Sequence, residues 1–583
     1  MPLSKEYLRS LVPENLPSGY DLLEEGKKIG ATLTAPEVKY LKKRGYTSAY
    51  QYRRDVAKKG IIRFTHNIGY PTVEETVKCI QEIHDFAEAN GVVFENAQII
   101  PDMTLAVPKE LREASPESTG TVFNKLEDFE MLNMEDVNVD IVNQVLTVPN
   151  ALQTTIDCVK AGLRSLGVSG ELAWNFPGCD DHVSYVEDTV RSLGILASKK
   201  DEGFQTSCYV EDGLAGSCID AVSFVGYYLF EQYIYRDLCG INFMSCFGGL
   251  VGDVRTKAAL MIALNDLGST DEYPGMVFTH SATTTQWDHD IECNYGPTLQ
   301  ELLMTMLTIR HYHLECQINV VPNSEHIRVP TLEEQKYAIV AAGRLLERID
   351  QWEDLIDFTE VERRAEIIKR EGQKMCQNIL DDLKAAGIDT HDPLQLLMVI
   401  KNINAALFEE AFHPSVRETG KFTPYFPNDM GKITEEKIAE ATKQIQTAGI
   451  ADTALKGKKI VIGSLDTHAY GRRYVKSILE SVGAEVIDGG VDCTVKSLFD
   501  LADEEGARYI GFSTHCGQCV GYSEQIMEIE KRRENKDFLF MGGILNTLLP
   551  GQSHPIDATD IVRKMGVFPS NNIVETIRAI ARS

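Results

Sequence analysis

The feature that most constrains this chain is a repeated alternation of short apolar runs with helix-length amphipathic stretches. The runs begin near residue 60 and recur at intervals of roughly 30–45 residues, a spacing typical of (β/α)8 barrels. They read "GIIRFTHN", "GVVFENAQ", "VDIVNQVLTV", "GELAWNFPG", "FQTSCYVEDG", "GINFMSCFGG", "GMVFTHSATTT" and "CQINVVPNSEH". We therefore expect a TIM-type barrel over residues 60–330, preceded by an N-terminal helical segment over residues 1–59.

Polar residues close each of these runs. In parallel barrels the carboxyl ends of the strands build the active site. Turn residues are polar in any protein, so one such strand end says little. All eight together favour a site, and the side chains that could bind polar groups of a substrate are His66, Asn96, Gln144, Asn175 and His280.

The remainder of the chain divides into two parts. Residues 331–457 read as a helical extension and linker, and residues 458–583 as a compact α/β domain. The strands expected in that domain are "KIVIGSL", "AEVIDGGV", "ARYIGFSTH", "DFLFMGGIL" and a short one near "GVFPS". This pattern predicts a flavodoxin-like, Rossmann-type fold, whose ligand site lies at the carboxyl ends of its strands.

The segment "SLDTHAYGRR" follows the first strand of this domain. Asp466 is close enough in sequence to orient the imidazole of His468, as a carboxylate does for a metal-ligating histidine. Gly471 allows the backbone to pass close to a ligand. Ser513 and the pair Gly542–Gly543 end two further strands at the same edge. The alternative is an ordinary loop histidine.

These residues resemble the cobalamin-binding domain of the base-off/His-on class. The resemblance implies that His468 is the lower ligand to cobalt and Asp466 its hydrogen-bond partner. It also implies that Ser513, Gly542 and Gly543 line the pocket for the nucleotide tail, with Gly490 at the second strand end. One departure concerns position 515, where the usual Ser-x-Leu motif has a histidine in place of leucine.

The upstream region resembles, more weakly, the catalytic barrel of glutamate mutase, and its fusion to a cobalamin domain resembles 2-methyleneglutarate mutase. In "CQINVVPNSEHIRVPTLEEQ", Glu325 matches a carboxylate that contacts the ribose of the adenosyl group. "AWNFPG" resembles a substrate-facing segment, which adds Trp174 to Asn175 as a candidate. The resemblance implies an adenosylcobalamin-dependent carbon-skeleton mutase, an isomerase that works through radicals on a small polar substrate.

The arginines with which glutamate mutase grips two carboxylates are not evident here. The corresponding place at the first strand is Ile68, and only Arg63 and Arg328 lie near strand ends. Glu211 and Asp212 add negative charge. A dicarboxylate would need other donors, so the sequence predicts the mutase class without its substrate.

Two other classes remain open. A cobalamin-dependent aminomutase would add pyridoxal phosphate through a lysine after the cobalamin histidine, and Lys476 lies at a spacing that does not match that family. A corrinoid methyl-transfer protein normally has a small helical cap directly before the histidine motif. Cys516 and Cys519 form a single CxxC, which is weak evidence for a zinc or redox site.

Composition narrows the partners and the location. A net charge of −28 argues against nucleic acid and anionic membranes as partners. The 13 scattered cysteines fit reduced thiols in a cytoplasm, and no stretch reads as a signal peptide or a membrane span. We expect a cytoplasmic enzyme of a small-molecule substrate, assembled as a homodimer or a larger homo-oligomer such as a tetramer.

Overall fold

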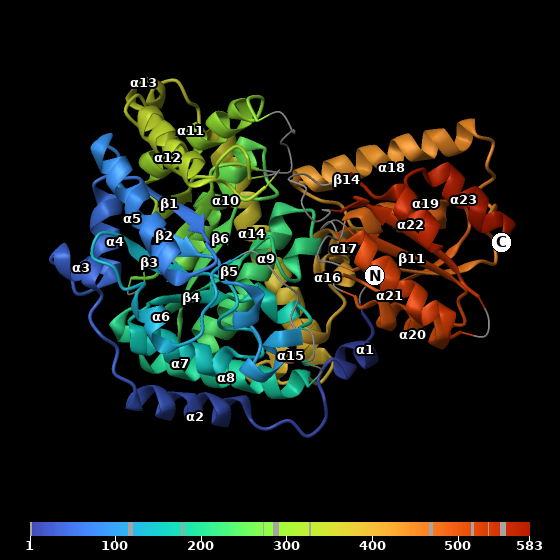
Figure 1. The fold of residues 1–583 in the computed structure, drawn as a ribbon, viewed down its shortest axis with the longest axis horizontal. Coiled ribbons are helices and arrows are strands. Elements are labelled where there is room, and N and C mark those ends of the chain that lie inside the picture. The colour runs from blue at the N-terminus through green and yellow to red at the C-terminus, as the bar shows by residue number, and fades with distance from the viewer. Residues whose placement is uncertain are drawn as a thin grey trace. The chain divides into compact units, whose positions relative to one another are not determined.

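The computed structural model places two compact units in the chain. The residues that it describes are 3–114, 120–176, 179, 181–271, 273, 275–283, 291–325, 328–465, 470–491, 493–514, 518–533, 536–547 and 556–583. The first unit comprises residues 1–215, 220–403 and 410–429, and the second comprises residues 216–219, 404–409 and 430–583. Figure 1 shows both as ribbons.

The first unit is built on a closed barrel of eight parallel strands in sequence order (Figure 1). The strands are β1 (Arg63–Ile68), β2 (Phe94–Ile99), β3 (Asn138–Ile141), β4 (Ser165–Val168), β5 (Gln205–Tyr209), β6 (Asn242–Phe247), β7 (Val277–His280) and β8 (Cys316–Asn319). Pairing of β1 with β8 closes the barrel. The predicted TIM-type fold is confirmed.

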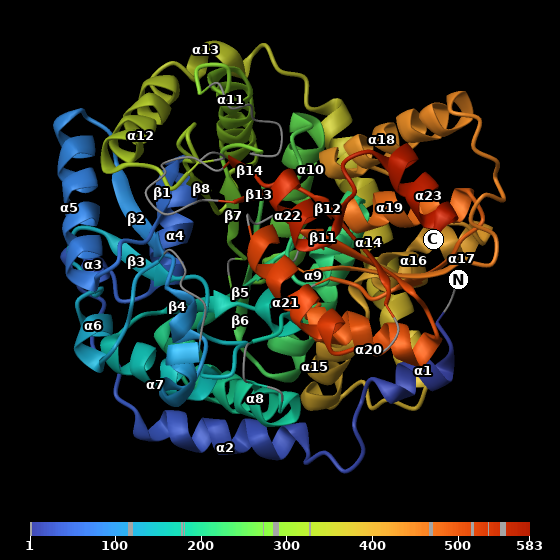
Figure 2. The ribbon, with the colours of Figure 1, turned by 45° about the vertical axis from the view of Figure 1, so that its right-hand side comes forward.

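Helices follow the strands and surround the barrel (Figure 2). They are α5 (Val73–Ala89), α6 (Leu126–Glu130), α7 (Ala151–Ala161), α8 (His182–Ser198), α9 (Ala221–Gln232), α10 (Val254–Gly268), α11 (Tyr295–Tyr312) and α12 (Leu332–Leu346). Helix α5 illustrates how the sequence encodes them. The Thr72 hydroxyl caps its first turn by accepting the Glu75 N–H, and Ile80 and Ile83 bury its apolar stripe.

The fourth strand differs from the prediction. The sequence pattern places it in "GELAWNFPG", but β4 is the preceding segment Ser165–Val168, and Gly170–Ala173 forms a 3-10 turn. The strand is only four residues long and contains Gly167 at φ +64°, so it lacks the apolar run by which the other strands are recognised. Trp174 and Asn175 therefore lie in a loop.

Four helices precede the barrel: α1 (Lys5–Ser10), α2 (Gly19–Thr32), α3 (Lys39–Lys43) and α4 (Ala49–Lys58). Tyr40 of α3 and Tyr52 of α4 are buried against each other, with their hydroxyl groups 2.8 Å apart. Tyr52 also donates to Glu95 of β2, near the amino end of the barrel. Helices α3 and α4 thus cover that end.

The extension after the barrel is helical, as predicted. It consists of α13 (Asp350–Glu353), α14 (Thr359–Ala385), α15 (Pro393–Asn402), α16 (Ala405–Phe412) and α17 (Pro414–Thr419). Helix α14 packs tightly on α9, where a Cβ added to Gly226 would stand 2.8 Å from the side chain of Met375.

The second unit contains the predicted parallel sheet. Its strands are β9 (Lys459–Ser464), β10 (Glu485–Asp488), β11 (Tyr509–Thr514), β12 (Phe538–Gly543) and β15 (Phe568–Pro569), in the order β10-β9-β11-β12-β15. The helices are α19 (Tyr470–Ser481), α20 (Val495–Glu505), α21 (Cys519–Lys531), α22 (Thr559–Met565) and α23 (Ile573–Arg582). Separate apolar clusters cover the two faces, and β13 (Asn546–Thr547) pairs with β14 (Ile556–Asp557).

The stretch before this sheet, interpreted from the sequence as a connector, contains helix α18 (Asp429–Thr447). Its Ala441 and Ile445 belong to the same apolar cluster as Ile460 and Ile462 of β9. Burial of one face of α18 explains why this polar segment is helical.

Among the described helices, none is long and apolar enough to cross a membrane. All cysteines in the described ranges are free.

Candidate functional site

The first candidate site is the carboxyl edge of the second unit's sheet. Strands β9, β11 and β12 are adjacent, and Ser513 stands in register with both Ser464 and Gly542. Gly543 has φ +100°, and a Cβ there would lie 2.0 Å from the carbonyl oxygen of Thr514. Only glycine fits this position, because its backbone packs directly against that of Thr514.

Asp466 and His468 lie outside the described residues, so the structure does not test their predicted roles. The residues on either side of them belong to this edge. The Leu465 N–H donates to the Ser513 carbonyl at 2.8 Å. A Cβ added to Gly471 would stand 3.0 Å from the Ser513 hydroxyl oxygen. The backbone that enters α19 therefore passes close to Ser513.

A polar network that the sequence analysis missed holds the first turns of α19. Asp488, at the end of β10, forms ion pairs with Arg472 and, at 3.6 Å, with Lys476. It also accepts the Gly490 N–H at 3.1 Å. Gly490 has φ +94°, which suits glycine. Asp488 thus joins α19 to the loop after β10.

At the described part of this edge Ser513 supplies a hydroxyl, and four glycines lie at or beside the strand ends: Gly471, Gly490, Gly542 and Gly543. Within the described residues we find no cluster of three or more metal-ligating side chains.

The second candidate site is a pocket of about 390 Å³ in the barrel. It lies at the carboxyl ends of β1, β5, β7 and β8, where parallel barrels place their active sites. The polar residues that line it are His66, Asn67, Tyr70, Tyr209, His280, Asn319, Glu325, Arg328 and Gln335. Of the barrel residues predicted from the sequence, His66, His280 and Glu325 come together here.

The His280 imidazole is fixed by Asn319 of the neighbouring strand. The Asn67 N–H donates to Asn319 Oδ1 at 3.2 Å, and Asn319 Nδ2 lies 2.8 Å from His280 Nδ1. Because a backbone N–H can only donate, the amide nitrogen of Asn319 is the donor to Nδ1. Burial, and secondarily Lys257, lower the pKa of His280 to about 3. This histidine is therefore neutral and carries its proton on Nε2.

His66 is also held neutral. Its Nε2 lies 2.8 Å from the backbone carbonyl oxygen of Gln335, and its ring is almost completely buried. Burial lowers the pKa of His66 to about 4. Tyr70 donates to the Gln335 side chain at 3.3 Å. The pocket wall near α12 is thus made of neutral hydrogen-bonding groups.

Two charged side chains stand at the pocket. Glu325 is solvent-exposed, while the surrounding protein desolvates its carboxyl group and raises its pKa. Arg328 forms a bidentate ion pair with Glu334, with N–O distances of 2.8 and 2.7 Å. Glu334 in turn caps α12 together with Thr331. The position of Arg328 is therefore set by the start of a helix.

Asn96 is not part of this pocket. The sequence pattern suggests a strand that ends at Asn96, but β2 continues to Ile99, so Asn96 lies in mid-strand. Its Oδ1 accepts from Asn138 Nδ2 at 2.7 Å, and its Nδ2 donates to Thr65 at 3.3 Å. These contacts lie toward the amino end of the barrel.

Gln144 also lies outside the pocket lining. Its backbone has φ +62°, and its N–H donates to both carboxylate oxygens of Glu171 at 2.9 Å. Trp174 packs in a small apolar cluster with Phe176. Asn175 Oδ1 and the Trp174 carbonyl both accept from Lys401. In the structure these three residues hold loops together.

The Glu211 carboxylate has hydrogen-bond partners that the sequence did not reveal. Its carboxylate accepts the N–H groups of Gly248, Gly249 and Leu250 at 2.6, 2.7 and 3.2 Å. Gly249 lines the pocket. The negative charge at this strand end therefore organises the loop between β6 and α10.

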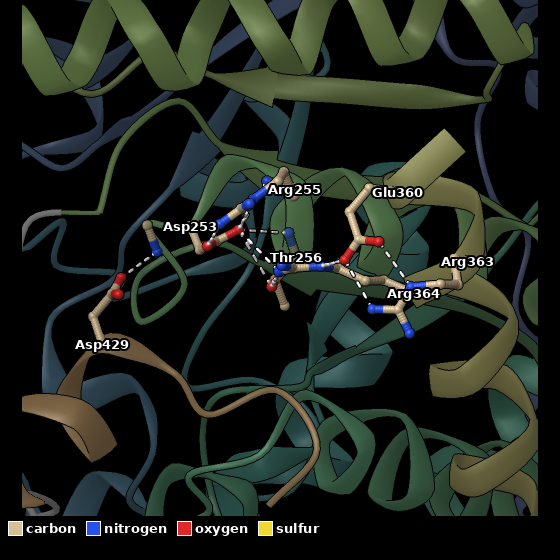
Figure 3. Close-up of polar contacts among 8 residues, drawn as sticks. Asp253, Arg255, Thr256, Glu360, Arg363, Arg364 and Asp429 are labelled. Carbon is tan, nitrogen blue, oxygen red and sulfur yellow. Dashed lines mark hydrogen bonds and ion pairs between the residues drawn. The ribbon is translucent and has the colours of Figure 1, made fainter. Parts of the chain in front are cut away.

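The same loop is anchored on its other side (Figure 3). Asp429, the last residue of the first unit, accepts the Gly252 N–H and donates its own N–H to the Leu250 carbonyl at 3.2 Å. Asp253 caps α10 and accepts from Arg364 of α14 at 3.1 Å. Burial raises the pKa of Asp253, but hydrogen bonds from the Arg255 side chain and the Thr256 N–H, together with the charge of Arg364, outweigh it and lower the pKa to about 2.

Comparisons with known proteins agree with the reading of the second unit. Residues 460–567 match the family "B12 binding domain". The chain thus has a B12-binding domain in its C-terminal part and an eight-stranded parallel barrel before it. It is a cobalamin-binding protein with a TIM-type barrel domain.

The comparisons with curated proteins and with solved structures provide no argument about the function. No curated protein matches the chain. Among solved structures, it is similar to a novel cobalamin-binding protein from Desulfitobacterium hafniense DCB-2, with 17% identity over 37% of this chain and 89% of that one. The TM-score is 0.19, so this likeness carries no argument.

Proposed function

We propose that the chain is an adenosylcobalamin-dependent mutase that rearranges the carbon skeleton of a small polar substrate. One observation carries the proposal: a B12-binding domain shares a chain with a parallel barrel that has a pocket at the carboxyl ends of its strands. The resemblance of the barrel to glutamate mutase and 2-methyleneglutarate mutase supports the same reaction class.

The proposed cofactor contacts follow the motif of the second unit. His468 would be a ligand to the cobalt, and Asp466 would orient its imidazole. Ser513, Gly542, Gly543 and Gly490 would line the place of the nucleotide tail. When bound, adenosylcobalamin supplies hydrogen abstraction by a carbon radical.

The barrel residues would bind and position the substrate. His280 offers a fixed N–H donor at Nε2, and Tyr209, whose ring packs beside it at 5.8 Å between centroids, offers a hydroxyl. Glu325 would accept hydrogen bonds from the ribose hydroxyl groups of the adenosyl moiety. Residues from four strands line the pocket, and radical chemistry there would require that water be kept from the reacting atoms.

The structure offers one observation on each of the two rival classes, the aminomutase and the methyl-transfer protein. For an aminomutase, Lys476 would carry pyridoxal phosphate, but it pairs with Asp488 at 3.6 Å beside Arg472. For a methyl-transfer protein, a helical cap would precede the histidine motif, and here a single long helix, α18, packs into the domain core. Neither observation favours a rival over the mutase.

Electron paramagnetic resonance of the full chain with cobalamin tests the cofactor assignment. We expect nitrogen superhyperfine coupling from a protein imidazole in wild type and its loss in His468→Ala. His391→Ala, at an exposed histidine of the extension, is the matched control and should keep the coupling. Coupling that survives in His468→Ala contradicts the assignment.

The reaction class needs a second measurement. With adenosylcobalamin and a panel of small acids and amino acids, one compound should produce an organic radical signal and a rearranged carbon skeleton. Methyl transfer from methylcobalamin, with no radical signal from any compound, would contradict the mutase.

A further inference from the structure

The charges at the barrel pocket restrict the substrate. Among the described residues that line it, the only acidic side chain is Glu325 and the only lysine or arginine is Arg328. His66 and His280 are neutral, because burial lowers the pKa of each to about 4 and about 3. Every other polar lining group is an amide, a hydroxyl or backbone.

The one cation is already neutralised. Both terminal nitrogens of Arg328 donate to the Glu334 carboxylate. Glu334 also accepts the Thr331 N–H at 2.8 Å and the Thr331 hydroxyl at 3.0 Å, so the helix cap holds it in place. The guanidinium of Arg328 would have to leave this bidentate pair before it could grip a carboxylate of a substrate.

Lys257, the other cation that acts on a pocket residue, is likewise committed. Its Nζ lies 2.7 Å from Glu301 Oε2, with both side chains 2% exposed. Separating such a pair would leave a buried charge without compensation. Lys257 therefore cannot serve a substrate.

The parts of the barrel chain outside the described residues contain no lysine or arginine. Residues 115–119 read SPEST, residues 284–290 read TTQWDHD, and residues 326–327 are His and Ile. None is lysine or arginine. A second carboxylate of a substrate would thus find no unpaired lysine or arginine in the barrel pocket.

We infer that this pocket takes a substrate without net negative charge, a neutral or ammonium-bearing one such as a diamino acid, rather than a dicarboxylate. The inference rests on the proposed function for the reaction class, but its evidence is the pocket alone. Glu325 strengthens it, because among the described residues no side chain pairs with its carboxylate, and this negative charge would repel a dicarboxylate even while it contacts a ribose. A single carboxylate of the substrate could still be bound by the His280 Nε2–H and the Tyr209 hydroxyl.

Calorimetric titration of the full chain with three probes of similar length tests this inference directly. We expect ornithine and glutamine to bind at least tenfold more tightly than glutarate at pH 7. Equal affinities for the three probes, including no binding by any, would overturn the inference. The titration needs neither turnover nor a cobalt signal, so it can fail while the mutase assignment stands, and the reverse.

A gain of binding gives the sharper test. Glu334→Gln removes the partner of Arg328 and leaves a free guanidinium at the pocket. We expect the affinity for glutarate to rise about tenfold, as for a charge-assisted hydrogen bond. Glu333→Gln is the matched control. The Glu333 carboxylate pairs with Lys336 at 3.0 Å, so this variant should bind glutarate as wild type does.

Because Glu334 caps α12, the variant should first be shown by its melting temperature to be folded. Arg328→Gln combined with Glu334→Gln should then return the affinity for glutarate to the wild-type value. If glutarate binding does not rise in folded Glu334→Gln, or rises equally in Glu333→Gln, the neutralised arginine does not set the specificity.

Discussion

The two ends of the barrel treat charge in opposite ways. At the amino end, a cavity of only about 40 Å³ is lined by Arg53, Arg63, Glu95 and Asp140, all at most 7% exposed. At the carboxyl end, a pocket about ten times larger has neutral histidines, amides and hydroxyls, and its one cation is paired. Charge is concentrated where there is no room for a ligand.

The charged amino end thus serves the stability of the barrel, and the carboxyl end serves ligand binding. At the amino end, helices α3 and α4 cover the charges, which are tied into a network by Tyr52 and the asparagines of β2 and β3. At the carboxyl end, neutral donors with fixed protons leave the pocket able to choose a substrate by hydrogen bonds. The predictions below change one end at a time.

The largest effect is expected from Glu301→Gln. It leaves Lys257 as a buried charge behind the pocket and removes an acceptor of Thr283, whose N–H and hydroxyl donate to Glu301 at 3.0 and 2.9 Å. We expect a loss of about 3–5 kcal/mol in stability, measured as a fall in melting temperature. The double variant Lys257→Met/Glu301→Leu should recover most of it, and a single variant as stable as wild type would show that this pair is not needed.

The next effect concerns ligand affinity. His280→Ala removes the Nε2–H donor and should weaken binding of the tightest probe by about tenfold or more. The melting temperature should change by far less than in Glu301→Gln. His311→Ala, at a histidine that stacks on Phe358 away from the pocket, is the control for both measurements. Unchanged affinity in His280→Ala would remove His280 from the site.

Asn96→Ala tests the amino end. It removes one of the two acceptors of Asn138 Nδ2 and one of the two donors to Asp140, whose pKa burial already raises to about 6. We expect about 1–2 kcal/mol less stability and unchanged ligand affinity. A normal melting temperature with weaker ligand binding would reverse the assignment of the two ends.

A pH dependence is expected at His66. Its pKa is about 4 in the folded protein and about 6.5 when unfolded. The unfolded chain therefore binds a proton between these values while the folded one does not, so stability is full above pH 6.5 and falls as the pH drops toward 4. The slope from this group is at most ~1.4 kcal/mol per pH unit.

The His66→Gln variant should lose less melting temperature than wild type between pH 7 and pH 5. His84→Gln serves as the comparison, because His84 is a partly buried histidine on α5, outside the pocket. Parallel melting curves of wild type and His66→Gln across this range would contradict a neutral, buried His66.

The fold followed from the sequence because apolar periodicity is local. Seven of the eight predicted strands correspond to observed ones, and the exception, β4, is the segment that combines four residues with a glycine at positive φ. Helix α18 was missed for the opposite reason. Its polar sequence reads as a linker, and only burial against β9 shows why it is helical.

A site could be predicted from the sequence only where the topology of the fold itself brings its residues to one edge of the sheet or one end of the barrel. Ser513 and Gly542 lie side by side because neighbouring parallel strands end together. The pairing of His280 with Asn319 depends on the register of β7 against β8, which no local pattern specifies. Asn96 and His280 are both polar residues in apolar runs, but one lies in mid-strand and the other ends its strand.

The anchor at Asp429 gives the barrel a mechanical property. The residue that ends the first unit is fastened to the β6–α10 loop, and the same loop supplies Gly249 to the pocket and is held from within by Glu211. Tension on the chain beyond residue 429 is therefore resisted at Leu250 and Gly252 before it can reach the pocket wall. A force on the chain that leads onward from residue 429 would meet these hydrogen bonds first, and the geometry of the pocket would be kept.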